Sequence, residues 1–186
     1  QSLRAAAADG PRAVTLTAAF LSGQVPHGRF GVGWRSLRDL PPAAATGTLT
    51  LRDVDEAFGT LAAASGAGSR AVRRATLDSL FGRATEAEQR FLGALVAGQV
   101  RQGALEGIVA QAVAVAADVA EADVRRAAML AGRTYAIAAE AILGGGAALA
   151  RVTLEVGRPV APMLATSAKV VAGAVSGRCS VERKLD

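Results

Sequence analysis

Residues 84–107 read ATEAEQRFLGALVAGQVRQGALEG, and this stretch contains one helix and the start of the next. Thr85 and Glu88 match a capping box, in which two side chains satisfy free backbone N–H groups at a helix start. Gly98 is suited to end that helix, because glycine readily adopts the left-handed conformation of helix C-termini. The pattern predicts helices over residues 86–97 and 104–117, joined by a short glycine-containing loop.

On both sides of residues 84–107 the sequence continues as short helical segments that end at glycines. This pattern predicts an all-α domain over residues 1–150. Hydrophobic residues make up 51% of the chain and aromatic residues only 4%, so we expect helices packed mainly through Ala, Leu and Val. Gly66, Gly98, Gly132 and the run at residues 144–146 are predicted helix stops. The other predicted helices cover residues 11–22, 34–40, 53–64, 69–82, 121–131 and 134–143.

Residues 151–186 differ from the rest of the chain. Residues 152–156 alternate as in a β-strand, and Pro159 and Pro162 disfavour a helix. A last helix is predicted at 167–175 and the start of a strand at 180–185. We therefore predict a second unit over 151–186, which consists of a linker and the beginning of another domain.

Charge and composition narrow the classes of function. The net charge is +5, and every one of the 21 basic residues except Lys169 and Lys184 is an arginine. Arginine binds phosphate through a two-pronged contact, although GC-rich coding also favours it. A single cysteine excludes an internal disulfide, and His27, the only histidine, is expected to be a solvated loop residue. The most apolar run, at 108–117, is half as long as the ~20 residues needed to cross a bilayer, so we expect a soluble intracellular protein.

Two similar loops follow a repeated word. SGQV at residues 22–25 recurs as AGQV at residues 97–100. The first copy leads into RFGVG at 29–33, within what we name the first basic loop (residues 24–33). The second copy leads into RQGA at 101–104, within the second basic loop (residues 98–104). The repeat predicts a pseudo-symmetric domain that presents two similar loops, with a chance match of a short word as the alternative.

A third basic loop (residues 65–70) reads SGAGSR and precedes Arg73 and Arg74. Cations at a helix start oppose the helix dipole, so they do not stabilise the helix, and an anionic partner would explain them. Free N–H groups at such a start bind phosphate. A solvated basic face is the alternative. The predicted phosphate-contacting residues, in the three loops and at the helix start that follows the third, are Arg29, Gly31, Gly33, Gly68, Ser69, Arg70, Arg73, Arg101, Gln102, Gly103 and Ala104.

Seven words occur in a fixed order along the chain: GVGW (31–34), SGAGSR (65–70), ATEAEQRFL (84–92), GQVRQGALEGI (98–108), RRAAMLAG (125–132), GRPVAPMLA (157–165) and ERKLD (182–186). In order and spacing the chain resembles ATP-dependent DNA ligases of bacterial type over nearly its whole length. The resemblance implies that residues 1–150 form a helical domain that binds nicked duplex DNA without regard to sequence. It also implies that 151–186 reach only the start of the adenylation (nucleotidyltransferase) domain.

In that family a Lys-x-Asp-Gly motif supplies the nucleophile, and Lys184 matches its lysine. The resemblance implies that Lys184 attacks ATP to form lysyl-AMP, and that the AMP then passes to the 5′-phosphate at a nick as DNA-adenylate. Glu182 and Lys184 are the implied cofactor-binding residues, with ATP and Mg²⁺ as cofactors of the full-length parent and no metal ligand within this chain. By itself the chain is expected to be inactive.

The resemblance further implies a monomeric cytoplasmic protein that works at the nucleoid, in DNA repair, replication or recombination, without a membrane partner. A different class of function remains open on composition alone: a helical regulatory or adaptor module that binds a protein partner. That alternative predicts an exposed apolar groove and little salt dependence, whereas DNA binding predicts basic loops on one face.

Overall fold

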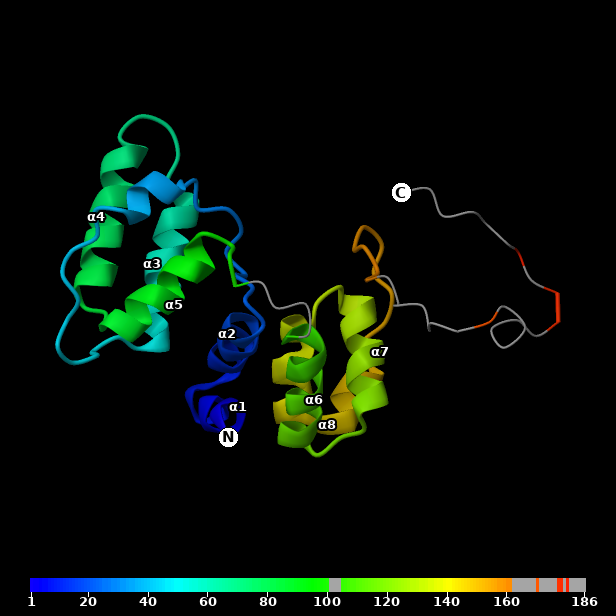
Figure 1. Cartoon of the computed structure of the whole chain (residues 1–186). Coiled ribbons are helices and arrows are strands. Elements are labelled where there is room, and N and C mark those ends of the chain that lie inside the picture. Colours follow the sequence, from blue (N-terminus) through cyan, green and yellow to red (C-terminus); the bar gives the residue numbers. More distant parts are fainter. Residues whose placement is uncertain (101–104, 162–169, 171–176, 179, 181–186) are drawn as a thin grey trace.

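The computed structural model describes residues 1–100, 105–161, 170, 177, 178 and 180. Within these residues all regular secondary structure is helical, as predicted, and no strand occurs (Figure 1). The α-helices are α1 (Ser2–Ala6), α2 (Pro11–Leu21), α3 (Leu51–Ala63), α4 (Ser69–Gly82), α5 (Glu86–Val96), α6 (Leu105–Ala117), α7 (Glu121–Ala131) and α8 (Ala138–Ala150). Short 3-10 helices are η1 (Ala7–Asp9), η2 (Trp34–Leu37) and η3 (Thr134–Ile137).

Two capping boxes start neighbouring helices. The predicted box at Thr85 and Glu88 is confirmed, because each residue's side chain accepts a hydrogen bond from the other's backbone N–H. A second box joins Thr50 and Asp53 and starts α3 two residues before the predicted position. Removing such a cap costs about 1 kcal/mol, so both residues fix where their helices begin.

The buried side chains form two clusters that share helix α2. One cluster is rich in alanine and valine and joins α1, α2 and α6 to α8. The other contains the chain's buried phenylalanines and joins α2 to α3, α4 and α5. Figure 1 shows the consequence: α3–α5 lie on one side of α2 and α6–α8 on the other. The expected core of Ala, Leu and Val therefore describes the first cluster, while phenylalanine fills much of the second.

The glycine run at residues 144–146 interrupts its helix at Gly145, as predicted, but the chain returns to helix directly after it. Helix α8 continues to Ala150, with a kink at Gly145, where φ is +60° and ψ −158°. Ala148 and Leu149 beyond the kink are buried in the first cluster. The burial of these apolar side chains draws the chain back into helix, which the local glycine signal could not reveal.

The strand predicted at residues 152–156 is wrong, because these residues form no strand. Leu154 is 70% exposed and Val156 is fully exposed. The carbonyl of Val152 accepts a hydrogen bond from the Arg126 side chain instead of a strand partner. A strand requires a neighbour to satisfy its backbone, and no described segment supplies one. The helix and strand predicted at 167–175 and 180–185 lie almost entirely outside the described residues, and the division at residue 150 stays a prediction.

Candidate nucleic-acid interface

The first and second basic loops begin with the same backbone geometry. In each, a glycine with positive φ (+68° at Gly23, +63° at Gly98) follows the helix end. Two backbone hydrogen bonds close each helix in the Schellman pattern. They are Gly23 N to Phe20 O (3.0 Å) and Gln24 N to Ala19 O (2.8 Å), repeated 75 residues later as Gly98 N to Leu95 O (3.1 Å) and Gln99 N to Ala94 O (2.8 Å). The sequence repeat therefore corresponds to a structural repeat at the two helix ends.

These two loops also touch each other. A β-carbon placed on Gly23 would lie 2.6 Å from the carbonyl oxygen of Val100, so only glycine allows this approach. Beside that contact, the Gln24 side-chain amide donates to a Glu106 carboxylate oxygen at 3.1 Å. The first basic loop thus lies against residue 100 of the second loop and the first turn of α6. Residues 101–104, which include the predicted contacts Arg101, Gln102, Gly103 and Ala104, lie outside the described residues.

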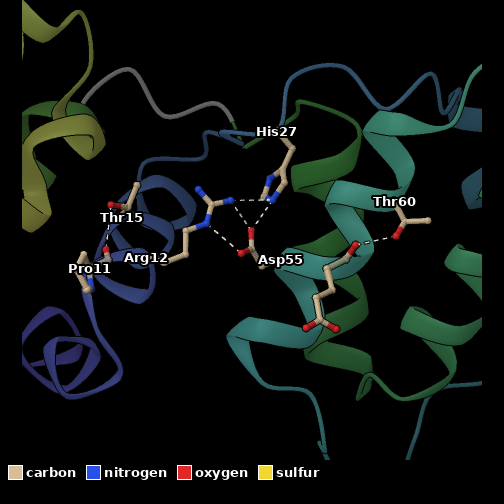
Figure 2. Close-up of polar contacts among 7 residues, drawn as sticks. Pro11, Arg12, Thr15, His27, Asp55 and Thr60 are labelled. Atoms are coloured by element: carbon tan, nitrogen blue, oxygen red, sulfur yellow. Dashed lines mark hydrogen bonds and ion pairs between the residues drawn. The ribbon is translucent and has the colours of Figure 1, made fainter.

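The side chains of Arg12, Asp55 and His27 bind one another and hold the first basic loop to helices α2 and α3 (Figure 2). Arg12 on α2 donates two hydrogen bonds to the Asp55 carboxylate of α3, at 3.0 and 2.5 Å. His27 Nε2 lies 2.6 Å from the same carboxylate. The bonds from Arg12, and after them the bond from His27, hold the pKa of Asp55 below its ordinary value, so this carboxylate stays charged at neutral pH.

His27 is not the solvated loop residue that the sequence suggested. Its side chain is only 6% exposed and packs edge-on against Phe58, with 5.7 Å between ring centroids. Nε2 lies within hydrogen-bond distance of both the Asp55 carboxylate (2.6 Å) and the Arg12 guanidinium (3.3 Å). The expectation was wrong because the residues that enclose His27 come from α2 and α3, far away in sequence. His27 anchors the loop.

The first and third basic loops meet at Arg73. Its Nε donates to the carbonyl of Phe30 in the first loop at 2.9 Å. Its Nη1 donates to Ser69 Oγ at 3.1 Å, and its Nη2 donates to the carbonyl of Ala64, just before the third loop. The structure therefore brings two of the predicted loops together through a residue that was itself predicted to contact phosphate. Arg74, one residue on, donates to the carbonyl of Asp39 at 2.5 Å and to Asp78 at 2.8 Å.

Other predicted contacts are open to solvent. Arg29, Gly31, Gly33, Gly68 and Arg70 are all exposed. Arg29 and Arg70 make no hydrogen bond or ion pair with another described residue, in contrast to Arg73 and Arg74. Gly68 has φ +81° and starts α4 without a side-chain cap, which leaves backbone N–H groups at this helix start uncapped by side chains. The exposed basic groups thus stand on two loops held side by side.

Gly31 and Gly33 provide a matched pair for testing this geometry. Gly31 has φ +61°, and a β-carbon on it would lie 2.9 Å from Arg73 Nη2, whereas nothing lies within 4 Å of such an atom on Gly33. Gly31→Ala is expected to lower the free energy of unfolding by about 1–2 kcal/mol. Gly33→Ala should change it by less than about 0.5 kcal/mol. Urea denaturation followed by circular dichroism measures both, and equal effects would contradict the described loop geometry.

The two residues that the resemblance assigns to the chemical step are at the C-terminal end of the chain. Glu182 and Lys184 lie outside the described residues, so their roles stay predictions.

No described helix has the length and apolar character needed to span a membrane. Sequence reasoning did not find Arg12 and Asp55 as supports of the interface, because they are 43 residues apart and no local pattern joins them.

Comparison with known proteins shows a similarity to DNA ligases. A family described as "DNA ligase N terminus" matches residues 32–114. A "Probable DNA ligase" of Mycobacterium sp. (strain KMS) is 52% identical over 186 residues, which cover 98% of this chain and 36% of the relative. Proteins of the same name from Streptomyces griseus and Nocardioides sp. (strain ATCC BAA-499 / JS614) are 51% and 49% identical, over 95% and 90% of this chain and 35% and 34% of the relatives.

These matches make the chain similar to the N-terminal region of DNA ligases. The resemblance to ATP-dependent DNA ligases that its motifs indicated is thereby confirmed. The chain spans about a third of the length of the curated relatives it matches.

Proposed function

We propose that this chain binds nicked duplex DNA without sequence preference, as part of an ATP-dependent DNA ligase. The observation that carries the proposal is the joining of the basic loops into one region. Gly23, which directly precedes the first loop, lies against Val100 of the second, and Arg73 connects the first loop to the third. Arg29 and Arg70 are exposed in that region, and neither forms a hydrogen bond or ion pair with another residue that the structure describes.

Such a surface suits a protein that must act at any nick. Contacts to phosphate and sugar position a protein on DNA without reading its sequence, and arginine side chains and backbone N–H groups make those contacts. In the proposal Arg29 and Arg70 contact phosphates, Gly31, Gly33, Gly68 and Ser69 allow close approach of the backbone, and the 101–104 segment provides the matching contacts of the second loop.

The chemical step belongs to the full-length parent. We propose that the Lys184 amine attacks the α-phosphate of ATP, so that a phosphoramide bond forms and pyrophosphate leaves. The AMP then passes to the 5′-phosphate at the nick, with Mg²⁺ offsetting the phosphate charge and Glu182 in the ATP-binding site. By itself the 186-residue chain is inactive in this proposal. The parent is a monomer that works at the nucleoid in the cytoplasm, in repair, replication or recombination.

The binding step predicts a strong dependence on salt. If about five phosphates are neutralised, the logarithm of the association constant should fall with the logarithm of salt concentration at a slope of roughly −4 to −5. Fluorescence anisotropy with a nicked duplex, measured from low to high salt, gives this slope. The double substitution of Arg29 and Arg70 by alanine should make the slope less steep by about 1.8, since each phosphate contact contributes about 0.9.

Two controls accompany that titration. Duplexes of unrelated sequence should bind alike, because base edges are not read. Arg90→Ala removes one exposed arginine of α5 that pairs with Glu86, and it should leave the slope nearly unchanged. A flat salt response, or no binding even at low salt, would contradict the proposal and would favour the helical adaptor.

A further inference from the structure

Arg73 holds three separate pieces of the chain. Its guanidinium nitrogens donate to the carbonyls of Phe30 and Ala64 and to the hydroxyl of Ser69. We propose that Arg73 is a positioning residue, which sets the first and third basic loops in register for DNA while making no phosphate contact itself. This inference rests on the proposed function and deepens it, because it separates the residue that shapes the surface from those that touch DNA.

The hydrogen bonds of Arg73 use three of its five N–H donors, so fewer remain for an outside anion. Each of its three side-chain nitrogens already has a protein acceptor, and the side chain is only partly exposed. Gly31 closes over the guanidinium, since a β-carbon at Gly31 would lie within 2.9–3.2 Å of three of its atoms. A phosphate would find only the second N–H of Nη1 and that of Nη2 free, and a contact through Nε would have to break a charge-assisted bond to a carbonyl oxygen, which is stronger than a neutral hydrogen bond.

The positions of the bonded groups explain how Arg73 acts. Phe30 directly follows Arg29, so the bond to its carbonyl fixes the backbone that carries the first exposed arginine. Ala64 ends α3 and leads into the third loop, and Ser69 precedes Arg70, so the other two bonds fix the backbone on both sides of that loop. Since an arginine presents its donors in a rigid planar fork, lysine cannot bridge these acceptors.

Hydrogen exchange tests the positioning role without DNA. In Arg73→Met, amide exchange should rise about tenfold or more in residues 28–33 and 64–70, and it should stay unchanged in α8. The milder Arg73→Lys should show the same pattern. Unchanged exchange in both loops would overturn the inference. A rise spread evenly over the chain in both variants would overturn it as well, because Arg73 would then support the whole fold.

DNA affinity then separates positioning from direct contact. Arg73→Met and Arg73→Lys should each weaken binding of the nicked duplex about tenfold, because disordered loops must be ordered again on binding. Lysine also binds phosphate as a point charge, so a direct contact would be largely rescued by Arg73→Lys. Arg90→Met, which removes the same charge from α5, should have little effect.

A double-mutant cycle completes the test. With Arg29 and Arg70 already replaced by alanine, Arg73→Met should cost about threefold or less in affinity, because the groups that it positions are gone. An equal loss in both backgrounds, or binding restored by Arg73→Lys, would overturn the inference. If the unaltered chain does not bind DNA at all, the proposed function fails, whereas the exchange experiment still decides whether Arg73 holds the two loops together.

Discussion

Lys184→Ala in the full-length protein is expected to abolish nick sealing. In the proposed reaction the Lys184 amine forms the only covalent bond between enzyme and AMP, and alanine offers no nucleophile in its place. Removing a covalent nucleophile lowers turnover by several orders of magnitude, of order 10⁶ in a serine protease. The measurement is incubation with α-labelled ATP and Mg²⁺, denaturing gel analysis of the protein, and a parallel assay of nick closure.

The chain provides a matched control for that substitution. Lys169 is its only other lysine, so Lys169→Ala removes the same charge and should leave labelling and nick sealing unchanged. The 186-residue chain alone should retain no label, since an unperturbed lysine amine is protonated at neutral pH and is then no nucleophile. Sealing by the Lys184→Ala protein, or label held by the short chain, would refute the assignment.

Local sequence signals predicted most of the helices, and the exceptions have identifiable causes. Thr85 with Glu88 and the glycines at 98 and 132 determine helix ends through bonds within a few residues, so they could be recognised directly. The glycines at 144–146 signalled a helix stop, and the backbone is indeed non-helical at Gly145, where the helix kinks. Burial of Ala148 and Leu149 then overrides it, and burial against distant helices is absent from any local pattern.

The parts of the candidate interface could be singled out in the sequence, but the way in which they are joined could not. Gly31 and Arg70 could be singled out because glycine and arginine next to a helix start suggest a phosphate contact. The role of Arg73 could not be inferred in this way, since Phe30, its partner in the first loop, lies 43 residues away. The sequence showed a basic residue at the right place, and only the fold reveals that its donors are bound to carbonyl oxygens.

Phe58→Ala is expected to have the largest effect on stability. The Phe58 side chain is fully buried in the second cluster, with its ring centroid 4.8 Å from that of Phe30 and 5.8 Å from that of Phe20. Truncation removes buried apolar surface and leaves a cavity, which costs about 3–5 kcal/mol at such sites. The free energy of unfolding of a native protein is about 5–15 kcal/mol, so this loss is a large part of the total. Urea denaturation measures it.

Phe91→Ala is the matched control, because Phe91 on α5 is 44% exposed and its loss should cost less than about 1.5 kcal/mol. Phe58 also supports the interface, since it packs against Phe30 and His27 of the first basic loop. At a temperature where Phe58→Ala is still folded, it should therefore weaken DNA binding, whereas Phe91→Ala should not. Equal losses of stability in the two variants would contradict the described packing. Undiminished DNA affinity in folded Phe58→Ala would show that the first loop does not depend on the phenylalanine cluster for its position.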